Sequence, residues 1–131
     1  MGNNPNLHHI LIRVCALAMK NLSQMNITYQ NQQILKHKSV NIGLAISSHM
    51  GLVVPVISGA DNLGLEEISR AVKSLTEGVR DNCLLVSDMA VKSMVVSNIG
   101  MYGVSTFLAI IDIPDSMIFA VGHIADYVVP E

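Results

Sequence analysis

The spacing of apolar residues predicts an amphipathic helix over residues 65–80. Steps of three and four residues separate its apolar positions, which places them on one helical face. Gly64 is positioned to cap this helix. Glu66 and Glu67 suit the positive end of the helix dipole, and Arg80 suits the negative end. The face expected to be buried consists of Leu65, Ile68, Val72, Leu75 and Val79.

A second helix is predicted over residues 7–19, ending near Asn21. Its apolar residues also recur at steps of four and three. Asn4 or Asn6 can cap it, and Pro5 suits a first helical turn because its missing N–H has no partner there. The face expected to be buried consists of Leu7, Leu11, Val14 and Ala18.

The segments between these helices alternate apolar and small residues, which is typical of strands. Residues 40–48 predict a strand, and residues 52–57 predict a second, wholly apolar one. Pro55 cannot donate to a ladder, so this second strand should lie at a sheet edge or carry a bulge. Residues 34–35 are β-like, and the uncharged residues 23–33 predict a connecting segment. One face of the first strand should consist of Val40, Ile42, Leu44 and Ile46.

Three further β-rich runs occupy residues 93–99, 106–113 and 116–124. Their nearly continuous hydrophobicity predicts strands covered on both faces. Residues 100–103 predict a turn and not a phosphate loop, because no clear amphipathic helix follows them. The whole pattern predicts one domain over residues 1–131. We expect an α/β (α+β) two-layer sandwich in which helices cover a sheet.

Composition narrows the classes of function. The chain has 131 residues, of which 50% are hydrophobic and 14% charged, with a mean hydropathy of +0.45. These values exclude a disordered chain. They favour an oligomer, because an excess of exposed apolar surface favours burial against another subunit. A net charge of −2 gives no electrostatic signal for nucleic acid or an anionic membrane.

Targeting signals are not evident in the sequence. No apolar run approaches the roughly 20 residues of a membrane-spanning helix. Residues 1–13 lack the order of a signal peptide, and two cysteines are too few for an exported disulfide scaffold. We therefore expect a cytoplasmic protein.

Residues with metal-binding or catalytic potential are scattered. His8 and His9 are neighbours about 100° apart around a helix, so they cannot hold one metal ion and are expected to be solvated. Cys15 and Cys83 lack zinc-ligand spacing and are expected to be small packing residues. Eight methionines beside two Phe and no Trp are expected to fill the core. The remaining histidines, scattered along the chain, are His37, His49 and His123.

A family resemblance rests on residues 96–103, Val-Ser-Asn-Ile-Gly-Met-Tyr-Gly. This octapeptide is similar to the Ile-Ser-Asn-Leu-Gly-Met-Tyr-Gly signature of the dihydrolipoamide acyltransferase catalytic domain, the core subunit of 2-oxoacid dehydrogenase complexes. Residues 40–46, 51–57 and 118–122 also resemble family segments in family order. The likeness runs from about residue 7 to residue 130.

The resemblance implies the fold of chloramphenicol acetyltransferase, in which helices cover a mixed sheet and three subunits assemble. It implies that coenzyme A and acyl-dihydrolipoamide enter a channel between subunits. Ser97 matches the serine whose hydroxyl stabilises the oxyanion of the tetrahedral intermediate. No metal is implied, no cofactor is required, and the family allows coenzyme A as a ligand.

The sequence also departs from the family pattern. None of its histidines belongs to the family's His-x-x-x-Asp-Gly motif, which supplies the general base. Val91-Lys92 replaces a usual Gly-Gly, and residues 112–114 replace a usual Asn-Pro-Pro. We therefore expect a truncated acyltransferase-like domain whose missing elements would expose apolar surface to a partner.

Three functions follow as hypotheses. The first is an oligomeric binding or assembly module, trimeric by resemblance or dimeric, without acyltransferase catalysis. The second is a coenzyme A-dependent acyltransferase that uses Ser97 and a base from elsewhere. The third is an interaction module that joins full-length acyltransferase trimers. A folded relic without a selected activity is the further alternative.

Overall fold

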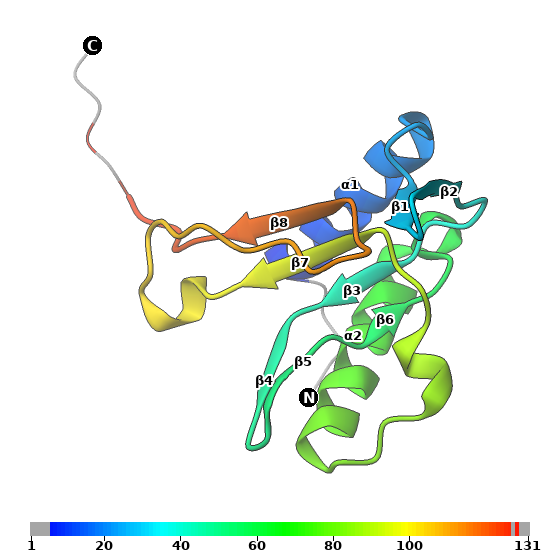
Figure 1. The fold of residues 1–131 in the computed structure, drawn as a ribbon. Helices are drawn as coiled ribbons and strands as arrows, with labels where there is room; N and C mark the ends of the chain where they lie inside the picture. The colour runs from blue at the N-terminus through cyan, green and yellow to red at the C-terminus, as the bar shows by residue number, and fades with distance from the viewer. Residues whose placement is uncertain (1–5, 127, 129–131) are drawn as a thin grey trace.

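The computed structural model of the protein describes residues 6–126 and residue 128. Two α-helices and eight strands are connected by short turns and 3-10 segments (Figure 1). The helices are α1 (Leu7–Asn21) and α2 (Leu65–Arg80). The strands are β1 (Ile27–Gln30), β2 (Gln33–Lys36), β3 (Ile42–Leu44), β4 (Ile46–Ser48), β5 (Gly51–Val53), β6 (Val56–Ile57), β7 (Met94–Asn98) and β8 (Met117–Val121).

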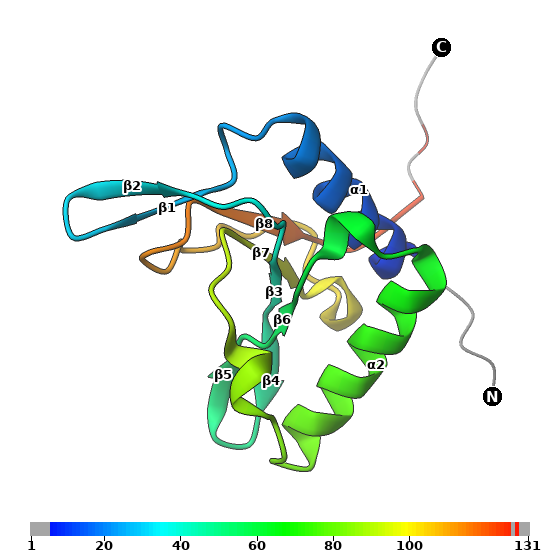
Figure 2. The same cartoon turned by 90° about the vertical axis from the view of Figure 1, so that its right-hand side faces the viewer.

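A four-stranded mixed sheet organises the domain, in the order β6-β3-β7-β8. β3 pairs antiparallel with β6 and parallel with β7, which pairs parallel with β8. Both helices lie on one side of this sheet, while the β1–β2 hairpin and the crossover from β7 to β8 lie on the other side (Figure 2). The predicted two-layer α/β architecture with a mixed sheet is confirmed. Neither described helix combines the length and apolar character of a membrane span.

The later helix has the bounds that the spacing predicts. Ile68, Leu75 and Val79 are buried on its inner face, and Leu65 and Val72 are half-buried. The backbone N–H of the cap residue donates to the Glu67 carboxylate over 2.6 Å, which gives a group at the exposed helix terminus a partner.

The predicted face of α1 is wrong, although the helix itself is confirmed. Leu7 is 46% exposed and Val14 55% exposed. Apolar residues surround this helix, so spacing alone could not select among adjacent stripes, and packing chose another. The buried positions are His9, Ile12, Cys15, Ala16 and Met19. The cap is Asn6, while Asn4 and Pro5 lie outside the described residues.

Several predicted strand boundaries are corrected. The expected connecting segment at residues 23–33 contains β1 and the start of β2, which form an antiparallel hairpin. The strand predicted over residues 40–48 breaks at Ala45 into β3 and β4. Pro55 breaks the strand predicted over residues 52–57, and β6 after it is a sheet edge, as Pro55 required.

The run at residues 106–113 is not a strand and is not covered on both faces. Leu108 is 96% exposed and Ile110 is 90% exposed, whereas Phe107 and Ala109 between them are half-buried. This period of two over residues 107–110 shows an extended segment with alternate side chains turned inward, whereas Ile111 and Ile113 are both exposed. The strands predicted over residues 93–99 and 116–124 are confirmed as β7 and β8, but β8 is only half-buried because it is a sheet edge.

The core lies between the helices and the sheet and contains fewer methionines than expected. Met19 and Met94 are buried, whereas Met50 and Met101 are more than three-quarters exposed. Cys15 is buried as predicted, but Cys83 is exposed, so its expected packing role is wrong. Aliphatic side chains fill most of the core, led by the fully buried Ile12, Ile42, Ile68 and Val96.

Candidate functional site

Ser97 lies on the side of the four-stranded sheet that the helices leave free. Side chains alternate along a strand, and its neighbour Asn98 points toward α1. Ser97 therefore points to the opposite side, which we call the helix-free face. Ser97 is half-buried, and its register partner Ala120 on β8 is exposed. A half-buried serine on a central strand suits the oxyanion role that the resemblance implies.

Among the residues that the structure describes, no histidine lies beside the Ser97 side chain. Asn98 contacts His8 on the helix side, and His123 lines the same pocket as His8. His37 contacts Thr28 in the β1–β2 hairpin over 2.9 Å. The two others are His9, which caps α1, and His49, which lies in the β4–β5 turn.

The expectation that His8 and His9 are solvated is wrong. His9 is only 8% exposed, and its Nδ1 accepts the Asn6 backbone N–H over 3.0 Å while its own N–H donates to the Asn6 side chain. This reciprocal capping box satisfies two groups at the start of α1. Burial lowers the pKa of His9, because desolvation disfavours the charged imidazole.

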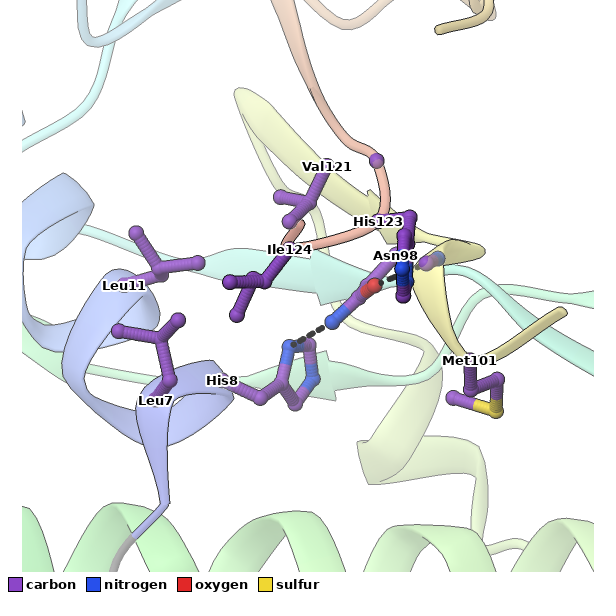
Figure 3. A pocket seen from close by; sticks show the side chains of 10 residues that line it. Leu7, His8, Leu11, Asn98, Met101, Val121, His123 and Ile124 are labelled. Carbon is purple, nitrogen blue, oxygen red and sulfur yellow. Dashed lines mark hydrogen bonds between the residues drawn. The ribbon is translucent and has the colours of Figure 1, made fainter. Parts of the chain in front are cut away.

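His8, Asn98 and His123 come together around one cavity of about 270 Å³ (Figure 3). We call it the α1–β7 pocket. The three side chains come from α1, from the end of β7 and from the segment after β8, and all three line the cavity. Its other lining residues are Leu7, Leu11, Gly100, Met101, Val121, Gly122 and Ile124.

Two glycines let the backbone segments of this pocket approach each other. A Cβ on Gly100 would collide with the carbonyl of Gly122, and a Cβ on Gly122 would collide with the carbonyl of Ser105. The close approach continues into the hydrogen bond from the His123 N–H to the Val104 carbonyl, 2.7 Å long. Residues 100–102 form a 3-10 turn that ends at Gly103, which confirms the predicted turn.

Hydrogen bonds fix the tautomer of His8. The Gly100 N–H donates to Asn98 Oδ1 over 3.0 Å, so the Asn98 amide nitrogen faces His8, 3.3 Å from Nδ1. An amide nitrogen can only donate, so His8 Nδ1 accepts and the proton of the neutral ring lies on Nε2. Burial first, and the neighbouring His9 second, lower the pKa of His8 and favour this neutral ring.

An ion pair between Lys92 and Asp115 lies near the N-terminal end of β7. Lys92 Nζ lies 3.1 Å from Asp115 Oδ2, an attraction without an aligned hydrogen bond, and the Asp115 side chain is 2% exposed. The Lys92 stem packs over Gly43, where a Cβ would collide with it. Burial raises the pKa of Asp115, nearby Asp112 adds to this rise, and Lys92 opposes it. Lys92, a departure from the family pattern, therefore has a structural partner.

An apolar groove separates α1 from the free edge of β8, and we call it the α1–β8 groove. It has a volume of about 280 Å³. Its walls include the helix stripe that was wrongly expected in the core, namely Leu11, Val14 and Ala18. The further lining residues are Cys15, Met19, Leu22, Met25, Met94, Met117 and Phe119.

Sequence reasoning placed Ser97 through its motif but missed the α1–β7 pocket. His8 and His123 are far apart in sequence, and no spacing rule links them. The one available signal was the pair of glycines at positions 100 and 122, since a glycine in or near a strand often marks a close backbone approach. Within the described ranges, no group of three or more His, Cys, Asp or Glu side chains could hold a metal ion.

Comparison with known proteins identifies the class of this incomplete α/β domain. The family described as 2-oxoacid dehydrogenases acyltransferase (catalytic domain) matches residues 2–131. The chain belongs to this family, which confirms the resemblance carried by residues 96–103.

Curated relatives agree with this assignment. The Arabidopsis thaliana dihydrolipoyllysine-residue acetyltransferase component 2 of the pyruvate dehydrogenase complex, mitochondrial, is 33% identical over 130 residues. Those residues cover 98% of this chain and 24% of the relative. The Mus musculus pyruvate dehydrogenase protein X component, mitochondrial, is 32% identical over 117 residues, covering 89% of this chain and 23% of the relative. The chain thus spans about a quarter of these relatives.

Solved structures confirm the fold. A probable dihydrolipoamide acetyltransferase from Listeria monocytogenes superposes with a TM-score of 0.89 at 29% identity, over 96% of this chain and 54% of that one. The cubic core of the pyruvate dehydrogenase multienzyme complex superposes with a TM-score of 0.90 at 26% identity, over 98% and 54%. The chain therefore has an acyltransferase-like core fold and covers about half of these solved chains.

Proposed function

We propose that this chain is an oligomeric binding or assembly module of the 2-oxoacid dehydrogenase core that transfers no acyl groups by itself. The observation that carries the proposal is the distribution of histidines around Ser97. The serine is on the helix-free face, while His8 and His123 are on the helix side of the same strand. An oxyanion donor without a base lacks a contribution of about a hundredfold to ten-thousandfold in rate.

Exposed apolar surface supports the assembly role. On the side of the sheet opposite the helices, the crossover presents Leu108 and Ile110 in one row, 96% and 90% exposed. Aliphatic side chains in such a row favour cover by another chain. The partners we propose are further copies of this chain, as a trimer or a dimer, and acyltransferase core subunits. Among the relatives, the protein X component and the cubic core are named as parts of pyruvate dehydrogenase assemblies.

Light scattering tests the assembly role directly. We expect the purified chain to have the mass of an oligomer, and to change the mass of full-length acyltransferase trimers after mixing. Leu108→Asp combined with Ile110→Asp should leave it monomeric and prevent joining. Val86→Asp is the matched control, because Val86 is 93% exposed in a 3-10 segment away from the crossover. A monomeric parent chain that leaves the trimers unchanged would refute the proposal.

An acyl-transfer assay tests the absence of catalysis. Acetyl-coenzyme A and dihydrolipoamide should give no turnover above a heat-denatured control. Clear turnover would contradict the proposal. The assay measures turnover and light scattering measures mass. The two measurements therefore test the absence of catalysis and the assembly role separately.

A second candidate function is a coenzyme A-dependent acyltransferase that takes its base from another chain. Its support is that Ser97 is only half-buried and that its register partner Ala120 is exposed, on a face that the helices leave free. Under this alternative, removal of the hydroxyl in Ser97→Ala should reduce turnover about a hundredfold or more. Unchanged turnover in that variant would exclude it.

The cytoplasmic location is also a proposal, and fluorescence microscopy of the tagged chain tests it.

A further inference from the structure

We propose that the α1–β7 pocket is a binding site for a small carboxylic acid with an aliphatic tail. The cavity lies on the helix side of β7, whereas Ser97, the residue that the family resemblance assigns to acyl transfer, points to the other face. The proposal therefore goes beyond the assembly function and does not depend on it.

The shape and lining of the cavity indicate a small, partly apolar ligand. Its volume of about 270 Å³ lies just below the usual range of ligand pockets, roughly 300–1,000 Å³. Leu7, Leu11 and Val121 give it aliphatic walls, and a few polar groups converge on one part of it (Figure 3). Apolar walls with few convergent polar groups are typical of small-molecule sites.

The polar groups favour an anionic acceptor. The Asn98 side-chain oxygen already accepts the Gly100 N–H, and His8 Nδ1 already accepts the Asn98 amide. The donor left on His8 is therefore Nε2–H, and His123 supplies a second imidazole. Among the residues that the structure describes, no acidic side chain lines the pocket. A carboxylate can accept from both imidazoles, whereas an ammonium group would find no charged acceptor.

Backbone contacts fix the position from which the exposed His123 side chain reaches the pocket. His123 follows Gly122, whose contact with Gly100 and the turn before it fixes the end of β8 against the end of β7. The first imidazole is held by the Asn98 amide and by the rigid start of α1. Because the His8 ring is positioned before a ligand arrives, only the exposed His123 imidazole has to be ordered on binding.

Nuclear magnetic resonance titration of the full chain with hexanoate tests this inference. We expect saturable shifts of the His8 and His123 imidazole resonances, while those of His49, which is exposed in the β4–β5 turn, stay constant. Hexylamine and hexanol are matched probes with the same tail, and each should bind at least about tenfold more weakly. Equal binding of hexanol would overturn the choice of a carboxylate, and equal shifts of His49 would overturn the site.

Two substitutions, each with a side chain close in size to the one it replaces, test whether hexanoate binds in the α1–β7 pocket. Asn98→Asp places a negative charge beside His8 and should weaken hexanoate binding about tenfold or more, the effect of about 1.4 kcal/mol. His8→Phe should do the same by removing the donor, and His49→Phe is its control. Circular dichroism establishes that each variant is folded. Folded Asn98→Asp that binds hexanoate as the parent does would overturn the proposal.

Discussion

The two faces of β7 differ in what they contact, although they belong to one strand. On the helix side, Val96 is buried in the core and Asn98 joins a hydrogen-bond network with α1. On the helix-free face, Ser97 is half-buried and the crossover exposes aliphatic side chains to solvent. The helix side therefore holds the buried core and the α1–β7 pocket, whereas the helix-free face holds Ser97 and the exposed crossover.

The largest expected effect separates the core from the exposed crossover. Ile42→Ala removes a side chain that is fully buried beneath the helices, and should lower the free energy of unfolding by about 4 kcal/mol. Ile110→Ala removes a 90% exposed side chain and should change it by less than about 0.5 kcal/mol in a monomer. Urea denaturation measures both. Similar losses in a monomeric sample would show that the crossover is buried in solution.

The second-largest effect tests how much the buried ion pair between Lys92 and Asp115 stabilises the fold. Lys92→Met keeps most of the stem over Gly43 but leaves the Asp115 carboxylate without its cation, which should cost about 3 kcal/mol at neutral pH. Chemical denaturation measures this loss. A loss below about 0.5 kcal/mol would mean that solvent reaches the carboxylate.

The sign of the pH dependence sharpens the same test. The pKa of Asp115 is raised in the folded chain above 3.8, so its contribution to stability is present in acid and is lost as the pH rises through the folded value. Without Lys92, which opposes the rise, this loss should extend to higher pH. Asp115→Asn in the Lys92→Met background is the control and should remove this dependence.

Adjacent residues of β7 provide a smaller contrast. Asn98→Ala deprives the Gly100 N–H and the His8 ring of their partners and should cost about 1–2 kcal/mol. Ser97→Ala should change stability by less than about 0.5 kcal/mol, because this side chain is only half-buried on the helix-free face. Thermal denaturation compares the two. A larger loss in Ser97→Ala would assign Ser97 a structural role.

The smallest effect concerns the start of α1. The pKa of His9 is lowered from 6.5 by burial, so the folded chain binds fewer protons than the unfolded chain as the pH falls below 6.5, and stability is lost in that direction. His9→Gln retains an N3 side chain suited to the capping box and cannot titrate. Its loss of stability between neutral pH and pH 5 should be smaller than that of the parent, by up to about 1 kcal/mol. Equal losses in the variant and the parent would mean that His9 does not contribute to the pH dependence of stability.

Local rules of the chain were sufficient for α2, for the sheet-edge position of the segment that contains Pro55 and for the turn after β7. In each case the deciding feature is local: a three-four apolar repeat, a missing N–H, or glycines. Those rules were insufficient for α1, where apolar residues surround the helix and only packing selects a stripe. They were also insufficient for residues 106–113, because an apolar run predicts a strand whether or not a partner strand is present.

The sequence by itself determined the family, the order of the main elements and the identity of Ser97 as the candidate oxyanion donor, because these depend on contiguous residues. The tertiary structure alone decided that His8 and His123 share a pocket with Asn98, that Lys92 pairs with Asp115, and that Ser97 faces away from the described histidines. The physical reason is that these contacts join residues distant in sequence. Their partners are selected by how strands pair and how α1 packs, and no local pattern encodes that choice.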